Sequence, residues 1–90
     1  MRGVVTNVIR KGQHVKDQGG YFFIKGEDGE DYFAHARDLE DRKGTPDIRL
    51  FELLVTRFSR HQRTEVAFEV SKVTKTGKGN GLSAVHVRVA

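Results

Sequence analysis

Cysteine is absent from the 90-residue sequence, which excludes disulfide bonds and metal sites built from thiolates. This absence also fits a reducing compartment. No apolar run approaches the roughly 20 residues that a membrane-spanning helix needs. The opening segment MRGVVTNVIRKG lacks the apolar centre of a secretory signal. We therefore expect a cytoplasmic protein that has no membrane partner.

Length and composition predict one small folded domain over residues 1–90, because a chain this short has room for a single core. Hydrophobic residues make up 37% of the chain and charged residues 31%, which is polar but not typical of disorder. No internal repeat or long linker interrupts it. The net charge of +4 permits a polyanionic partner without identifying one.

Five segments have the alternation or composition of β-strands, at about residues 2–10, 21–25, 31–36, 65–73 and 82–89. Asp28-Gly29 predicts a hairpin turn between the second and third, because glycine adopts positive φ at low cost. In the fourth strand, alternation predicts one shared face for Val66, Phe68 and Val70. In the fifth, it predicts one face with Leu82, Ala84 and His86, and another with Val85, Val87 and Val89.

A helix is predicted over residues 46–59, with Thr45 as N-cap and Pro46 at the first helical position. Its apolar residues recur at helical spacing, as Ile48, Phe51, Val55 and Phe58. This stripe either completes the core or binds a protein partner.

The order of these elements predicts an all-β, five-stranded OB-fold barrel with one inserted helix between strands three and four. An SH3-like barrel is the commonest alternative for this strand count, but it does not usually have a helix at that point.

Five of the eight aromatic residues fall within residues 19–36. Alternation puts one set, Tyr21, Phe23, Phe33 and His35, on one face of the hairpin. It puts another set on the opposite face, namely Phe22, Ile24, Tyr32 and Ala34. Only one face of a small barrel points inward, so one aromatic set must lie outside or on the rim.

Exposed rings reduce solubility unless they bind something, and the bases of single-stranded nucleic acid stack on such rings. Basic residues that can meet phosphates surround the hairpin, namely Arg10, Lys11, Lys16, Lys25 and Arg37. Rings for bases together with cations for the backbone predict a single-strand binder.

Four motifs in order resemble the cold-shock domain family along most of the chain. They are GVV at 3–5, GGYFFI at 19–24, YFAH at 32–35 after an Asp-Gly turn, and RTEVAFEV at 63–70, followed by AVHV at 84–87. The resemblance implies an OB-fold, and it implies that Tyr21, Phe23, Phe33 and His35 stack on bases. It therefore implies that Phe22, Ile24, Tyr32 and Ala34 point inward.

The sequence departs from the family pattern at positions that bear on binding. Gly19 replaces a lysine, and Asn7 and Val8 fall where the family has two further stacking rings. These changes predict weaker binding or a shorter bound segment. Phe22 replaces a glycine on the core side, so we expect Ala34 and the helix to make room for it.

No other motif predicts catalysis or a cofactor. The four histidines lack metal-ligand spacing, and Asp28 builds a turn rather than an acid–base pair. GKGNG at 77–81 lacks the residues of a phosphate loop, although Lys75 and Lys78 nearby can contact phosphate.

We therefore expect a non-enzymatic protein, without metal or cofactor, that binds single-stranded RNA or DNA as an RNA chaperone or transcript-regulating module. The alternative is a protein-interaction module that uses helix 46–59. The sequence leaves open the base preference, the choice of RNA or DNA, and the oligomeric state.

Overall fold

The structure is a computed structural model that describes residues 1–10, 20–72 and 82–90. Its elements follow one another along the chain as β1 (Arg2–Arg10), β2 (Gly20–Gly26), β3 (Asp31–His35), the 3-10 turn η1 (Ala36–Asp38), β4 (Leu39–Glu40), α1 (Leu50–Ser59), β5 (Glu65–Lys72) and β6 (Leu82–Val89). The five predicted strands are confirmed as β1, β2, β3, β5 and β6.

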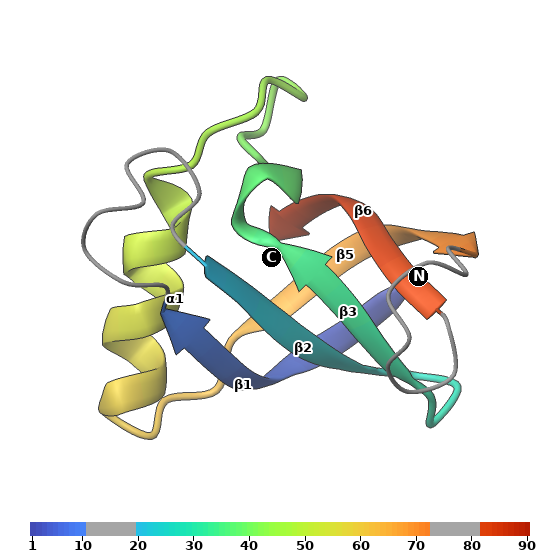
Figure 1. Cartoon of the computed structure of the whole chain (residues 1–90), viewed down its shortest axis with the longest axis horizontal. Coiled ribbons are helices and arrows are strands. Elements are labelled where there is room, and N and C mark those ends of the chain that lie inside the picture. The colour runs from blue at the N-terminus through green and yellow to red at the C-terminus, as the bar shows by residue number, and fades with distance from the viewer. Residues whose placement is uncertain (11–19, 73–81) are drawn as a thin grey trace.

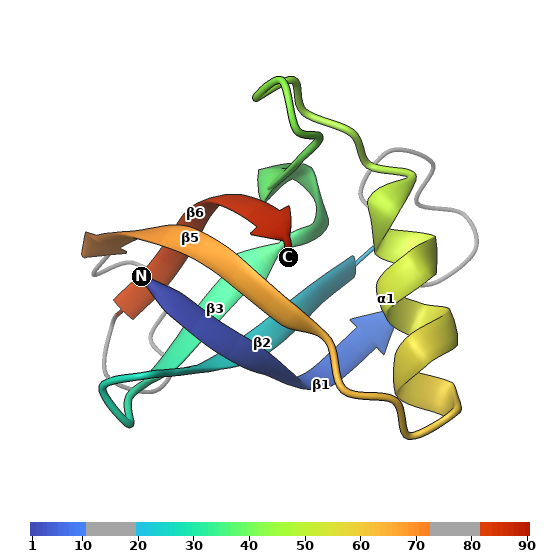
Figure 2. The same cartoon turned by 180° about the vertical axis from the view of Figure 1, so that it is seen from behind.

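Strand pairing closes these five strands into a mixed barrel (Figure 1). The order is β3-β2-β1-β5-β6, with antiparallel neighbours, and β3 also pairs with β6 in parallel through Phe33 and Ser83. The two-residue strand β4 pairs in parallel with β6, outside this circuit. Seen from behind (Figure 2), β5 and β6 form the wall opposite β2 and β3. A closed five-stranded barrel with one helix is consistent with an OB-fold.

The predicted position of the helix is wrong by one strand, because β4 comes before it. The helix lies between β4 and β5, not directly after the third strand, because η1 and Leu39–Glu40 come first. A strand of two residues is too short to show alternation, so its sequence carried no signal.

The hairpin of β2 and β3 fixes the inner face of the barrel. Gly26 and Glu30 join the strands through a backbone hydrogen bond of 2.8 Å, and Gly29 has φ of 85°, as the Asp28-Gly29 turn predicts. The inward side chains are the ones that alternation and the resemblance predicted, namely Phe22, Ile24, Tyr32 and Ala34, all buried. Val66 and Phe68 meet them from the opposite wall, with the Phe68 ring 5.1 Å from that of Tyr32.

A bulge in β6 corrects the predicted faces of the last strand. Residues 86 and 87 of β6 lie opposite Phe68 alone, because the register shifts between Ala67 and Glu69. His86 adopts φ of 51°, which turns its side chain outward and points Val87 into the core. Val70 was predicted to share the inner face, but it is 42% exposed. Alternation predicts a direction, whereas burial depends on what covers that end of the strand.

Helix α1 begins four residues later than predicted and ends at Ser59 as predicted. Thr45 and Pro46 do not start it, because the backbone there pairs with β4. Glu40 forms a bridge with Pro46, and the Asp47 N–H donates to the Leu39 carbonyl at 2.9 Å. Arg49 occupies the N-cap position and makes no side-chain capping bond.

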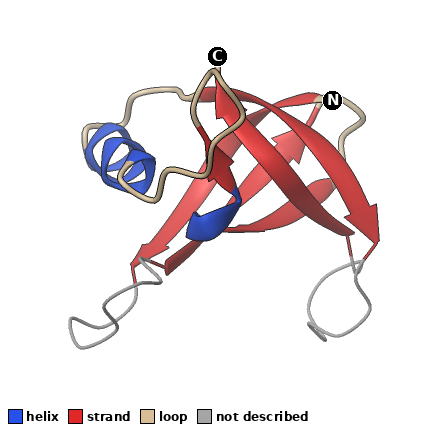
Figure 3. Ribbon diagram, turned by 90° about the horizontal axis from the view of Figure 1, so that it is seen from above, coloured by secondary structure: helices blue, strands red, loops and turns tan. Residues whose placement is uncertain are grey.

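The helix covers one end of the barrel (Figure 3). Phe51 and Leu54 are buried there, and Leu50 and Val55 pack against the same core. The predicted stripe is therefore wrong at both ends. Ile48 precedes the first helical turn and is exposed, Phe58 is also exposed, and the buried Leu54 was not predicted. Within the described ranges, no helix has the length and apolar character to cross a membrane.

Candidate nucleic-acid interface

Three aromatic rings form a cluster on the outer face of the β2–β3 hairpin. Phe23 and Phe33 are directly opposite each other in the antiparallel register, and their ring centres lie 5.8 Å apart. Tyr21 lies 5.9 Å from Phe23 and 5.4 Å from Phe33. We call Tyr21, Phe23 and Phe33 the ring cluster. Its side chains are half-buried, since they cover one another and yet face away from the core.

His35 extends the ring cluster along β3, opposite Tyr21 in the register. The Arg37 N–H donates to Nδ1 of His35 at 3.2 Å, and the His35 N–H donates to Oδ2 of Asp38 at 3.0 Å. These two bonds form a capping box at the start of η1. In a neutral imidazole an accepting Nδ1 leaves the proton on Nε2. His35 is thus held by its own backbone in an orientation in which Nε2 is a donor.

Two of the predicted basic residues are placed near the ring cluster. Lys25 follows Phe23 by two positions on the same face of β2 and pairs with Asp31 at 3.1 Å. Its side chain is half exposed, so water screens this pair and its contribution to stability is small. Arg37 lies exposed on η1, next to His35. Both cations therefore border the hairpin at opposite ends.

The remaining predicted basic residues are not placed by the structure. Arg10 is the last residue of β1, opposite Gly20, and only its backbone is described. Four lysines lie outside the described residues, namely Lys11, Lys16, Lys75 and Lys78.

The neighbouring strand β1 carries no aromatic residue beside the ring cluster. Asn7 lies opposite Phe23 and Ile9 opposite Tyr21. The Asn7 side chain accepts a hydrogen bond from the Val8 N–H at 3.0 Å, and Val8 packs against the core. The outer face therefore offers three mutually contacting rings on β2 and β3, flanked on β1 by an amide and an aliphatic side chain.

Chemically, this surface offers aromatic rings for flat apolar groups and two exposed cations for anions. Among the described residues, no three metal-binding side chains come together. Asp28 accepts a hydrogen bond from the Tyr32 hydroxyl at 2.6 Å. This bond lowers the pKa of Asp28 and raises that of Tyr32 to about 12. The ionised Asp28 carboxylate therefore stabilises the turn by accepting hydrogen bonds from the Tyr32 hydroxyl and the Glu30 N–H.

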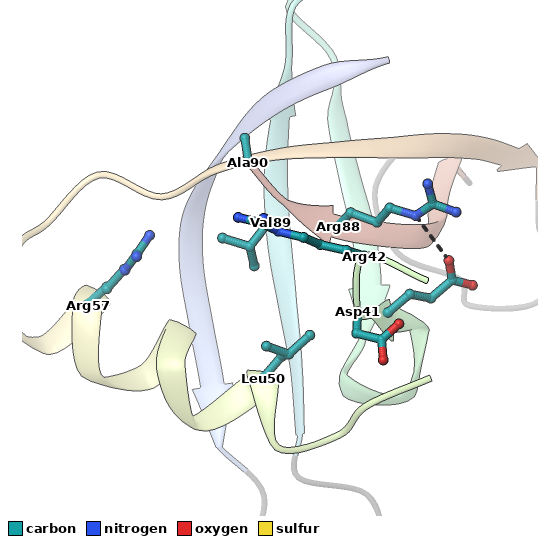
Figure 4. Close-up of a pocket in the computed structure, with 8 residues that line it drawn as sticks. Asp41, Arg42, Leu50, Arg57, Arg88, Val89 and Ala90 are labelled. Carbon is teal, nitrogen blue, oxygen red and sulfur yellow. Dashed lines mark ion pairs between the residues drawn. The ribbon is translucent and has the colours of Figure 1, made fainter. Parts of the chain in front are cut away.

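Sequence reasoning missed a second polar cluster, where β4 pairs with β6. Glu40 is buried on β4, where His86 Nδ1 donates to its Oε2 and Arg88 Nε lies 3.5 Å from its Oε1. Figure 4 shows the Glu40–Arg88 pair beside a pocket. The hydrogen bond from His86 to Glu40, followed by the charge of Glu40, raises the pKa of His86. Glu40 and His86 are 46 positions apart, so no local pattern could have linked them.

No family model matches this chain, and no curated protein or solved structure matches it either. The structure shows a closed barrel consistent with an OB-fold, while the likeness to cold-shock domains rests on the sequence motifs alone.

Proposed function

We propose that this protein binds single-stranded nucleic acid by stacking bases on the ring cluster. The observation that carries the proposal is the contact among Tyr21, Phe23 and Phe33, at 5.4 to 5.9 Å between ring centres, outside the barrel. Each base stacked on an aromatic ring contributes about 1–3 kcal/mol. Lys25 and Arg37 at the two ends of the hairpin supply charge for the phosphates.

The resemblance to cold-shock domains supports the same surface, because the family motifs put base-stacking residues at the ring cluster and at His35. In the proposed role, the protein acts as a non-enzymatic RNA chaperone or transcript-regulating module. Since Asn7 and Val8 replace two family rings, the bound segment is short. Two or three bases match the three rings available.

The deciding experiment is a titration of a fluorescently labelled, pyrimidine-rich single-stranded oligonucleotide, compared with duplex of the same sequence. Saturable binding that weakens in Phe23→Ala supports the proposal. Phe58→Ala is a matched control, because it removes an equally large ring from α1, away from the hairpin. Equal loss of affinity in both variants contradicts the proposed surface.

A second candidate function, docking of a protein partner on α1, is favoured by one observation. Leu53 and Phe58 on α1 are 36% and 40% exposed, and Ile48, just before the helix, is 37% exposed. Exposed large apolar side chains that are close in sequence can mark an interaction site. A titration in which no single-stranded oligonucleotide binds, with the protein folded, would favour this candidate over the first.

A further inference from the structure

A pocket of about 300 Å³ lies between α1, the loop after β4 and the end of β6 (Figure 4). This volume is at the lower end of the range for small-molecule sites, about 300–1,000 Å³. Leu50 and Val89 give it an apolar wall, and Arg42 and Arg57 stand at its edges. None of its lining residues belongs to the β2–β3 hairpin, so the ring cluster does not explain it.

The two acidic residues of the pocket already have partners. Glu40 is engaged by His86 and by Arg88. Oδ1 of Asp41 accepts from the backbone N–H groups of Lys43 and Thr45, at 2.8 and 3.0 Å. The Asp41 hydrogen bonds hold the loop after β4 in place. The Glu40–Arg88 ion pair offsets the charges of these two residues.

Arg42 and Arg57 are the pocket's cations without an ion pair, and Asp41 is its one carboxylate side chain without an ion pair among the described residues. In the described parts of the chain, neither guanidinium makes an ion pair or hydrogen bond with another protein group. Figure 4 shows Arg42 extending from the loop toward Val89, and Arg57 rising from α1 on the other side of the pocket. Two guanidinium groups that approach one apolar hollow from different elements create a local excess of positive charge.

Helix geometry explains why Leu50 and Arg57 line the same pocket. They are seven residues apart on α1, which puts them on one face and about 10 Å from each other along the axis. Leu54 lies between them and is buried in the core. The helix therefore presents an apolar residue near its beginning and a cation near its end to one ligand.

We propose that this pocket binds a phosphate monoester, with the phosphate between Arg42 and Arg57 and its organic group against Leu50 and Val89. A planar carboxylate is satisfied by the fork of a single guanidinium. The terminal oxygens of a phosphate point in tetrahedral directions, so they accept hydrogen bonds from donors that arrive from separate elements. The phosphate can belong to a free nucleotide or to the 5′ end of a nucleic acid.

The test is a titration of ¹⁵N-labelled protein with phenyl phosphate, followed by NMR, with inorganic phosphate and benzoate as comparison ligands. Phenyl phosphate carries both features that the pocket requires. We expect shifts at the amides of Arg42, Arg57 and Val89, and binding about tenfold tighter than for either comparison ligand. Equal affinity for benzoate, or shifts confined to residues 21–35, would overturn the proposal.

Matched variants separate the pocket from net charge and from the ring cluster. Arg42→Gln and Arg57→Gln should each weaken phenyl phosphate binding about tenfold. Arg60→Gln removes the same charge next to the end of α1 without lining the pocket, so it should bind as the unmodified protein does. Phe23→Ala should also leave this binding unchanged. A loss in Arg60→Gln equal to that in Arg57→Gln, or a loss in Phe23→Ala, contradicts the assignment.

The two sources of phosphate are distinguished by further ligands. Uridine 5′-monophosphate tests the free nucleotide. A 5′-phosphorylated oligonucleotide, compared with its 5′-hydroxyl form, tests the nucleic-acid end. A pocket that takes a strand end gives tighter binding of the phosphorylated oligonucleotide, and Arg57→Gln abolishes that gain. The absence of binding by either phosphate source excludes the site. Because Phe23→Ala leaves the pocket intact, failure here is distinguishable from failure of base stacking.

Discussion

The ring of Phe22, at the inner face of β2, lies 6.3 Å from the ring of Phe51 on α1, with 41° between their planes. Phe22 is directly opposite Ala34 in the hairpin register. The small neighbour leaves space on one side, and the helix supplies a ring on the other. Phe22 and the helix are therefore parts of one packing unit, as the sequence comparison with the cold-shock pattern suggested.

Replacement of Phe51 by alanine should lower the free energy of unfolding by about 3–5 kcal/mol, because removal of this buried ring leaves a cavity beside Phe22. Urea or thermal unfolding measures the loss. Phe58→Ala removes an exposed ring from the same helix and should cost far less. The remaining folded fraction of Phe51→Ala should still bind oligonucleotide. A Phe51→Ala protein that melts like the unmodified chain would mean that the packing described here is wrong.

Loss of a ring from the ring cluster should affect binding more than folding. Phe23→Ala and Phe33→Ala should each weaken single-strand binding by about 1–3 kcal/mol, the contribution of one stacked base. Phe22→Ala, on the opposite face of the same strand, should mainly reduce stability. Fluorescence titration and thermal melting of the three variants provide the comparison. The reverse pattern, with Phe23→Ala unfolded and Phe22→Ala unaffected, would mean that the two faces of β2 are assigned the wrong way round.

Salt should weaken binding to a degree that reports the number of phosphates contacted. With about 3–5 phosphates in contact, log K should fall against log salt with a slope of about −2 to −4 for a single strand. Duplex of the same sequence should bind more weakly, because its bases are not free to stack. An affinity that does not change with salt would contradict the proposed phosphate contacts.

Stability should depend on the protonation of His86. Glu40 raises the pKa of His86 above its ordinary value of 6.5, so the folded state holds this proton more tightly than the unfolded state does. The resulting stabilisation is complete below pH 6.5 and disappears as the pH rises through the higher folded value. His86→Asn removes the titration and suits the positive φ at this position, since asparagine tolerates it well. The pH dependence of the free energy of unfolding above pH 6.5 should be flatter in His86→Asn. An unchanged profile would contradict the link to Glu40.

Ionisation of the Tyr32 hydroxyl should require a higher pH than that of an ordinary tyrosine. The Asp28 carboxylate accepts a hydrogen bond from the Tyr32 hydroxyl, and this bond raises the pKa of Tyr32 to about 12. An ultraviolet titration of tyrosinate should show one group ionising well above the ordinary value of 10.0. Asp28→Asn should bring that group down toward the ordinary value. A titration in which no group of the unmodified protein ionises above the ordinary value would exclude the bond.

The hairpin could be predicted from sequence because nothing interrupts its alternation. Residues 21–25 and 31–35 pair without a register shift, so a period of two assigns every side chain to a face. In β6 the alternation of side chains breaks after Val85, because His86 adopts a left-handed backbone conformation. A histidine side chain gives no indication of such a conformation. A glycine at that position would have indicated a positive φ in the sequence.

The helix and the pocket show two other limits. Thr45-Pro46 has the pattern of a helix start, yet pairing of this segment with β4 determined its backbone instead. The ring cluster depends on neighbours within one hairpin, which sequence can bring together. Arg42, Arg57 and Val89 line one pocket only because the fold brings α1, the loop after β4 and the end of β6 together. No spacing in the sequence therefore predicts their pocket.

Phe33 has two roles in this architecture, since it belongs to the ring cluster and is also the residue through which β3 pairs with β6. Among the described residues, this is the pair that completes the circumference of the barrel. A junction made by one pair of residues opens at a lower free energy than the long antiparallel ladders around it. A ligand bound to the ring cluster therefore contacts the residue that joins β3 to β6. Binding should slow the hydrogen exchange of amides in both strands, including those of β6 that the ligand does not touch.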